Sequence, residues 1–137
     1  MPETVDERMA IARRLIKNLT SEGVALDDIF IDPMVRPVAT GSHYGMVAIE
    51  TIRKVKNEFP QVHIACGLSN ISFGLPARKI LNQSFLVAAM AAGMDGAIVD
   101  PLDKKLMSFV YASEALFGVD DYCMEFLTKF REGEIEV

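Results

Sequence analysis

The sequence predicts an α/β fold in which short parallel strands alternate with helices. Three apolar runs rich in β-branched residues are evenly spaced along the chain, near residues 29–32, 62–66 and 97–100. Apart from His63 they are apolar at successive positions, which is typical of strands covered on both faces of a parallel sheet. Segments with helical hydrophobic spacing separate them. This alternation implies right-handed crossovers between neighbouring parallel strands.

Helical patterns fill the remaining sequence. The first helix is expected to start with a capping box formed by Thr4 and Glu7, and Gly23 supplies its stop. Ser42 is suited to cap the second helix, and Pro76 to open the third. The five expected helices cover residues near 4–23, 42–58, 77–92, 104–117 and 120–131.

The length of 137 residues predicts one domain that spans residues 1–137. Two architectures fit the element order: a doubly wound sandwich and a piece of a (β/α)8 barrel. Neither glycine-rich phosphate-binding motif follows a strand, which disfavours a nucleotide-binding sandwich. A complete barrel needs roughly 250 residues, so this chain would hold about three βα units of the eight. Because the first helix lacks a preceding strand, we expect the C-terminal portion of a barrel.

A sheet of three strands leaves open edges and an apolar face. We therefore expect the chain to associate with a copy of itself as a homo-oligomer, or with a missing N-terminal half-barrel.

Composition and charge exclude several classes of protein. Half of the residues are hydrophobic and 24% are charged, which excludes a disordered chain. The net charge of -5 disfavours nucleic-acid and anionic-membrane binding.

Cys66 and Cys123 form neither a disulfide framework nor a zinc site, and no metal-ligand spacing is present. The charged residues 1–14 predict no signal peptide, and no apolar run reaches membrane-spanning length, so a cytoplasmic location is expected.

The candidate site consists of the polar residues that follow the three strands. Ligands of parallel α/β folds bind at the carboxyl ends of the strands. Asp32, the segment from Gly67 through Ser69 to Asn70, and Asp100 occupy these positions. Asn70 is the strongest candidate, because an amide that donates and accepts at once suits the edge of a heterocycle.

Most of these residues also have a purely structural interpretation. Asp32 precedes a proline and can form an Asx turn or a cap, and this stays open beside a functional role. For Asp100 a structural role is favoured, since Asp100 and Asp103 can both cap the following helix. Asn70 can instead bond within its own loop. Arg78 is unfavourable for the dipole at a helix start, so it either reaches a carboxylate at the site or is solvated.

Two further residues have structural interpretations. His63 lies inside a strand, where a satisfied core or interface histidine is expected. Cys66 ends a strand without a neighbouring base, so a buried and inert thiol is expected.

Three segments, residues 31–41, 66–78 and 81–103, carry a resemblance to the pterin-binding methyltransferase family. Members of that family transfer a methyl group between methyltetrahydrofolate and the cobalt of a corrinoid protein. The resemblance covers about residues 5–120. It implies a TIM-type (β/α)8 pterin-binding barrel that forms homodimers. Dihydropteroate synthase and the folate domain of methionine synthase belong to the same superfamily.

The resemblance also implies roles for individual residues. Asp32 and Asn70 would contact the pterin ring, with Asn70 near N5, and Arg78 would belong to a polar network behind them. Asn70 and Asp32 are expected to be the catalytic residues. By their position after the strands, Gly67, Ser69 and Asp100 are expected to belong to the binding surface as well. Tetrahydrofolate or 5-methyltetrahydrofolate would be the substrate, and a partner protein would carry the cobalamin. N5 of methyltetrahydrofolate is a poor leaving group unless it is protonated or hydrogen-bonded as its bond to the methyl group breaks. Hydrogen bonds from donors placed near N5 therefore become stronger in the transition state.

The family's earlier strands supply further pterin-binding acids and amides, which this chain lacks. The resemblance therefore implies that the chain supplies the C-terminal half of the pterin site. Two alternatives remain. A dihydropteroate synthase-like enzyme is disfavoured, because Asp100 stands where that enzyme needs a basic anion site. A non-catalytic assembly module would dock through its open sheet edges and the apolar helix near residues 86–92.

Overall fold

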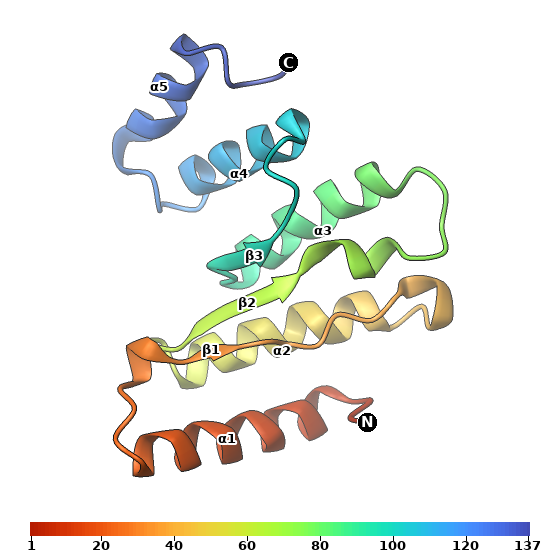
Figure 1. The fold of residues 1–137 in the computed structure, drawn as a ribbon, viewed down its shortest axis with the longest axis vertical. Coiled ribbons are helices and arrows are strands. Elements are labelled where there is room, and N and C mark those ends of the chain that lie inside the picture. Colours follow the sequence, from red (N-terminus) through yellow and green to blue (C-terminus); the bar gives the residue numbers. More distant parts are fainter.

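A computed structural model describes residues 1–137 and shows a three-stranded parallel sheet packed against helices (Figure 1). The strands β1 (Phe30–Ile31), β2 (His63–Gly67) and β3 (Gly96–Ile98) lie in the order β1-β2-β3. Phe30 pairs with His63 and Cys66 pairs with Ala97, both in parallel register. The predicted α/β class is confirmed. Parallel register brings the carboxyl ends of all three strands to one edge of the sheet.

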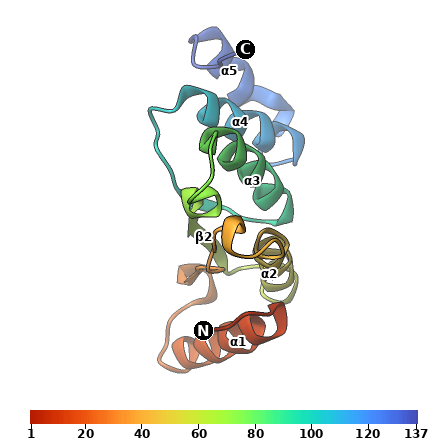
Figure 2. The ribbon, with the colours of Figure 1, turned by 90° about the vertical axis from the view of Figure 1, so that its right-hand side faces the viewer.

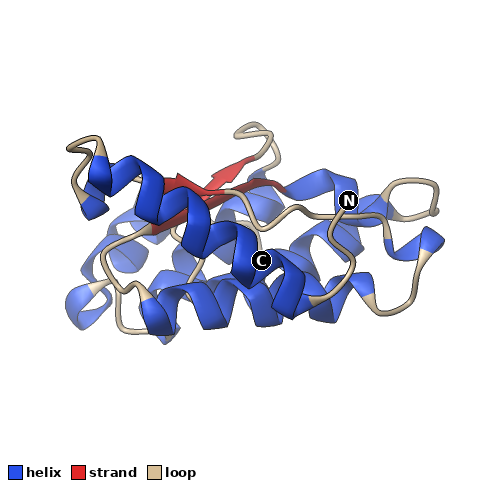
Figure 3. Ribbon diagram, turned by 90° about the horizontal axis from the view of Figure 1, so that it is seen from below, coloured by secondary structure: helices blue, strands red, loops and turns tan.

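Five α-helices accompany the sheet and are stacked in chain order along the long axis of the molecule (Figure 2). They are α1 (Val5–Ser21), α2 (Tyr44–Glu58), α3 (Arg78–Ala92), α4 (Lys104–Leu116) and α5 (Met124–Arg131). The helices lie to one side of the strands (Figure 3). None of them is both long enough and apolar enough to cross a lipid bilayer.

The ends of α1 follow the sequence signals closely. The hydroxyl of Thr4 accepts a hydrogen bond from the Glu7 N–H at 3.2 Å, and the Glu7 carboxylate accepts one from the Thr4 N–H at 3.0 Å. This is the predicted capping box. Beyond the helix, Gly23 has a φ of 90°, a left-handed conformation that glycine adopts without steric cost.

The hydrophobic core lies between the sheet and the helices. Alternate strand residues point toward the helices, as the two-residue period of a strand requires. Ile64 and Cys66 of β2 are almost completely buried there. Further core residues come from all four longer helices: Met9, Ala12, Ile16, Ala48, Ile52, Val55, Phe85, Leu86, Ala89, Ala92 and Leu106.

The opposite face of the sheet is uncovered, which corrects the expectation that the strands are buried on both faces. Phe30 is 63% exposed and Ile98 is 78% exposed. The reason is that all the helices pack on the same side, so the apolar residues of the other face have nothing against them. Exposed apolar residues on a sheet face are typical of a surface that another segment covers.

Two element boundaries also differ from the predictions. The strand expected near residues 97–100 ends at Ile98, because the chain turns at Asp100. The helix expected near residues 120–131 begins at Met124. Tyr122 and Cys123, just before it, both have a φ of 56°, and this left-handed backbone cannot continue a helix.

The starts of α2 and α3 use different residues from those predicted. The residue before α2 is His43, and no side-chain hydrogen bond caps the helix, so Ser42 is not its cap. The helix α3 begins at Arg78, after Ala77 in a left-handed conformation. Pro76 therefore lies in the preceding loop and does not open the helix.

Candidate functional site

The candidate site is the edge of the sheet where the three strands end. Asp32 directly follows β1, Gly67 ends β2, and Asp100 comes shortly after β3. A 3-10 turn over Leu68–Ser72 follows β2 and carries Asn70. Asp32, Asn70 and Asp100 are all exposed at this edge. The parallel register therefore places the candidate residues of three separate segments on the same side of the molecule.

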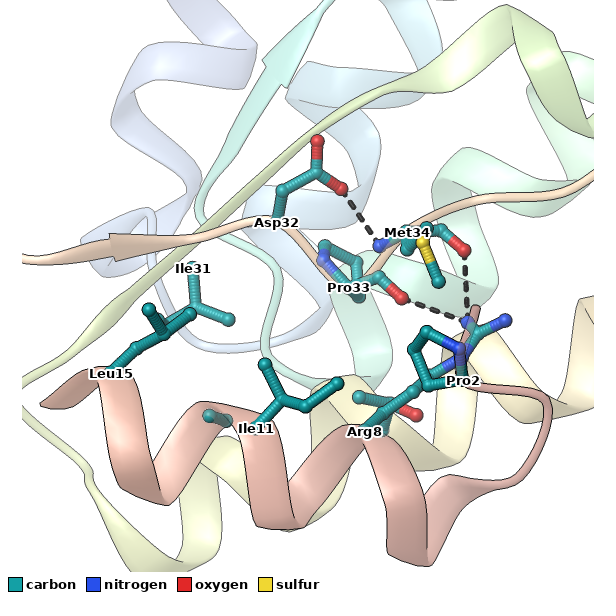
Figure 4. Close-up of a pocket in the computed structure, with 10 residues that line it drawn as sticks. Pro2, Arg8, Ile11, Leu15, Ile31, Asp32, Pro33 and Met34 are labelled. Atoms are coloured by element: carbon teal, nitrogen blue, oxygen red, sulfur yellow. Dashed lines mark hydrogen bonds between the residues drawn. The ribbon is translucent and has the colours of Figure 1, made fainter.

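Asp32 forms an Asx turn with one of its two carboxylate oxygens. Its Oδ1 accepts a hydrogen bond from the Met34 N–H at 2.8 Å (Figure 4). Met34 has a φ of 61°, which is uncommon for a residue with a side chain. Nη1 of Arg8 donates to the carbonyl oxygens of Pro33 and Met34 at 2.8 and 2.9 Å and holds the turn in place. The second carboxylate oxygen of Asp32 makes no protein hydrogen bond.

Asn70 joins the turn after β2 to the loop after β1. Its Nδ2 donates a hydrogen bond to the carbonyl oxygen of Val35 at 2.7 Å. The bond reaches a different loop, so the amide is not satisfied within its own loop. A side-chain amide has two N–H donors and one carbonyl acceptor. The bond to Val35 fixes the amide and leaves the second N–H and Oδ1 without a protein partner.

Arg78 supports the turn that carries Asn70. Its Nη2 donates to the carbonyl oxygen of Ser69 at 2.7 Å, and its Nε donates to the Ser72 hydroxyl at 3.0 Å. The Ser72 hydroxyl is fully buried and lies 2.7 Å from Oδ1 of Asn82, to which it can donate. This network lies beside Asn70, and Arg78 makes no hydrogen bond to Asp32.

Ser72 and Asn82 were missed by the sequence interpretation. One signal for Asn82 was available, because it lies four residues after Arg78 and therefore on the same face of α3. Nothing in the sequence marks Ser72 apart from its place near the other polar residues of the turn.

Asp100 follows β3 and has the same local geometry as Asp32, which follows β1. Its Oδ1 accepts a hydrogen bond from the Leu102 N–H at 2.9 Å, which is again an Asx turn. The structural role expected for Asp100 is therefore present as an Asx turn, and Asp100 does not cap α4. Asp103 is the cap, with Oδ1 accepting from the Leu106 N–H at 3.1 Å, because it is the residue that directly precedes the helix.

His63 lies away from the candidate site. It begins β2, and its Nδ1 lies 2.7 Å from Oδ2 of Asp95. Asp95 also accepts a hydrogen bond from the Ile64 N–H at 2.7 Å, and Nζ of Lys56 lies at 3.4 Å. This cluster ties β2 to the turn before β3. His63 is therefore a satisfied histidine, as the sequence predicts.

The thiol of Cys66 is predicted to be unreactive. Cys66 is 1% exposed, and burial raises its pKa to about 11, with the Asp32 carboxylate adding to the rise. At pH 8 the thiol is therefore almost entirely protonated, and the thiolate is the reactive form. We expect a thiol reagent to label the exposed Cys123 alone in the native chain and both cysteines in denaturant. Rapid native labelling of Cys66, located by mass spectrometry, would contradict this burial.

Replacing Arg78 by methionine is expected to loosen the turn over Leu68–Ser72, because two hydrogen bonds from the guanidinium to the turn are lost. Hydrogen exchange of the turn amides should accelerate, while exchange in the core of β2 stays unchanged. Lys79→Met is the matched control, since Lys79 is exposed and lies 3.7 Å from Asp103 in a surface ion pair. Equal exchange rates in the two variants would show that Arg78 does not hold the turn.

Comparison with known sequences decides the family. Residues 1–100 match the family described as pterin binding enzyme. This chain belongs to the pterin-binding enzyme family. The resemblance noted from the sequence is thereby confirmed.

Relatives within the family include a methylcorrinoid:tetrahydrofolate methyltransferase from Eubacterium limosum. It is 36% identical over 135 residues, which cover 98% of this chain and 50% of that protein. Methionine synthases from Mycobacterium leprae and Mycobacterium tuberculosis are 43% identical over 103 residues, or 70% of this chain and 8% and 9% of those proteins. The chain therefore spans about half the length of the first relative and a small part of the other two.

Proposed function

We propose that this chain supplies the C-terminal half of a pterin site on a (β/α)8 barrel. The complete site would serve methyl transfer between 5-methyltetrahydrofolate and the cobalt of a corrinoid protein. The observation that carries the proposal is the anchored amide of Asn70, with a free N–H and a free carbonyl where the strand ends meet. The similarity to a methylcorrinoid:tetrahydrofolate methyltransferase over 98% of the chain supports it.

The chemistry at N5 of the folate explains the need for such an amide. When the methyl group passes from cobalt to N5, the new N–C bond forms, the N5 proton leaves, and the cobalt keeps the electron pair of the broken bond. In the reverse direction N5 takes an electron pair back as its bond to the methyl group breaks. The electron pair places negative charge on N5, and a hydrogen-bond donor near N5 stabilises that charge in the transition state. A donor that is already fixed in place needs no reorganisation. In the proposal the second N–H of Asn70 is that donor.

The remaining candidate residues bind and orient the pterin ring. The free carboxylate oxygen of Asp32 accepts hydrogen bonds from ring N–H groups, since an ionised carboxylate only accepts. Gly67, Ser69 and Asp100 extend the surface at the strand ends. Arg78 is a positioning residue, because it contacts the turn that carries Asn70. The cobalt is a substrate group carried by the corrinoid partner, so the chain needs no nucleophile of its own.

Methyl transfer tests this proposal when the remaining half of the site is supplied. We define the complementing half as the half of the Eubacterium limosum methyltransferase that lies outside the match to this chain. Co-expressed and purified with the chain, it should form an assembly that converts methylcobalamin and tetrahydrofolate to cob(I)alamin and 5-methyltetrahydrofolate. The absorbance of cob(I)alamin reports the reaction. An assembly that forms but produces no cob(I)alamin contradicts the proposed activity. Dihydropteroate formation in a separate assay, supplied with a dihydropterin pyrophosphate and p-aminobenzoate, assigns a different one.

A further inference from the structure

Arg8 of α1 is a buried cation whose protein partners all lie in one turn. Its residue is 5% exposed, whereas arginine is almost never buried unless it is paired. Nη1 donates to the carbonyl oxygens of Pro33 and Met34 at 2.8 and 2.9 Å, and Nε and Nη2 have no hydrogen-bond partner. A buried guanidinium stays charged, and its removal from water is unfavourable. What the chain gains from this burial is a fixed turn after β1.

The turn that Arg8 holds consists of two consecutive peptide units. The first unit joins Pro33 to Met34, and its N–H is the group that donates to Oδ1 of Asp32 at 2.8 Å. The second unit joins Met34 to Val35. Peptide units are planar and rigid, so a hydrogen bond to each carbonyl fixes the orientation of both units. Arg8 therefore sets the direction of the N–H group that binds the Asp32 carboxylate.

The next carbonyl along the chain is the one that anchors Asn70. Nδ2 of Asn70 donates to the oxygen of Val35 at 2.7 Å. Only the φ and ψ angles of Val35 separate this carbonyl from the second peptide unit that Arg8 holds. Val35 is 8% exposed and belongs to the hydrophobic core, which restricts these two angles. A movement of the turn therefore moves the Val35 carbonyl and the amide of Asn70 with it.

The turn needs such support because its backbone is strained. Met34 has a φ of 61°, and a residue with a side chain keeps this left-handed conformation only where its surroundings hold it. Without the guanidinium, two hydrogen bonds to the turn are lost, and Met34 is free to relax to the commoner conformations with negative φ. Such a relaxation reorients both peptide units.

We propose that Arg8 is a positioning residue for methyl transfer, which aligns Asp32 and Asn70 by holding the backbone that both of them bind. The inference rests on the proposed function and deepens it by naming the residue behind the two groups that face the pterin. In Figure 4 the guanidinium of Arg8 and the carboxylate of Asp32 lie on opposite sides of the turn. Arg8 therefore acts through the carbonyls of the turn and does not touch the substrate.

A double-mutant cycle in the complete assembly tests the coupling between Arg8 and Asn70. We expect Arg8→Met to lower kcat for methyl transfer about tenfold or more, because a small displacement of reacting groups slows the chemistry strongly. In the Asn70→Ala background the same change should lower kcat by about twofold or less, because the amide that Arg8 positions is already absent. Arg13→Met is the matched control on the same helix, since Arg13 forms an exposed ion pair with Glu58, and it should leave kcat unchanged.

The cycle separates positioning from a general structural role. A variant that only reduces the amount of folded assembly lowers kcat by the same factor in both backgrounds. Equal factors in the two backgrounds therefore overturn the inference. A wild-type kcat in Arg8→Met overturns it as well.

The side-chain amide of Asn70 gives a second readout on the chain alone, without pterin or methyl transfer. Its two protons are assigned in nitrogen-15 correlation spectra as the pair that disappears in Asn70→Ala. Their exchange with water should be several-fold faster in Arg8→Met than in the wild type, because the bond to the Val35 carbonyl is weakened. Arg13→Met should exchange at the wild-type rate. Arg8→Gln is the second variant, since its shorter side chain cannot reach both carbonyls, and it should accelerate exchange in the same direction.

The two readouts distinguish failure of the inference from failure of the proposed function. Unchanged exchange of the Asn70 amide in a folded Arg8 variant overturns the inference, whatever the activity. If exchange accelerates as expected while the wild-type assembly transfers no methyl group, only the proposed function fails. An active assembly whose kcat does not respond to Arg8→Met contradicts only the positioning role.

Discussion

Replacing Asn70 by alanine is expected to lower the rate of methyl transfer in the complete assembly by a factor of about 10²–10³. The variant removes the N–H that we place near N5, together with the hydrogen bond to the Val35 carbonyl. A donor that acts mainly in the transition state lowers kcat and kcat/KM together and changes KM little. Steady-state kinetics with tetrahydrofolate as the varied substrate measures this split.

The control for Asn70 is another exposed asparagine, Asn57, which lies on α2 away from the strand ends. Asn57→Ala should transfer the methyl group at the wild-type rate. Asn57→Ala should keep the thermal unfolding midpoint of the wild type, since surface changes are usually worth about 0.5 kcal/mol or less. Asn70→Ala should lower the midpoint by no more than several degrees, because the hydrogen bond that it loses to the Val35 carbonyl is worth about 0.5–1.5 kcal/mol. If Asn70→Ala raises KM alone, the amide only binds the pterin and takes no part in the chemistry at N5.

Replacing Ile64 by alanine is expected to destabilise the isolated chain by about 2–5 kcal/mol. Ile64 is completely buried in the core between β2 and the helices, and its truncation removes apolar contacts and leaves a cavity. Denaturant unfolding followed by circular dichroism measures the free energy of unfolding directly.

Ile98 provides the matched comparison, because the same substitution falls on the uncovered face of the same sheet. Ile98 is 78% exposed, and Ile98→Ala should change the free energy of unfolding of the isolated chain by about 0.5 kcal/mol or less. Similar losses in the two variants would contradict the one-sided packing of the sheet.

The elements that are set by local sequence were predictable. The capping box of α1, the three strand segments and the alternation with helices all arise from neighbours in the chain. The start of α5 was not predictable, since it depends on a left-handed backbone at Tyr122 and Cys123, which carry side chains. The apolar pattern of the strands predicted that both faces of the sheet are buried, whereas helices cover only one face in the structure. An apolar pattern indicates that a face is suited to burial without naming the segment that covers it.

The same contrast between local and long-range features holds for the candidate site. The residues after the strands were found because strand ends of a parallel sheet must meet at one edge. Arg8 was missed, because a single arginine on an amphipathic helix has no distinguishing pattern. Its burial and its bonds to the carbonyls of Pro33 and Met34 depend on contacts more than twenty residues apart in the sequence. Ser72 was missed for a related reason, since its importance comes from bonds to Arg78 and Asn82.

Tetrahydrofolate binding tests the central claim that this chain carries part of a pterin site. Isothermal titration should be performed on the chain, on the complementing half, and on the two together. We expect binding only for the two together, with one folate per complex, and weaker binding when the chain carries Asn70→Ala. A chain that binds tetrahydrofolate alone as tightly as the complex, or a complex that binds none, would contradict the account.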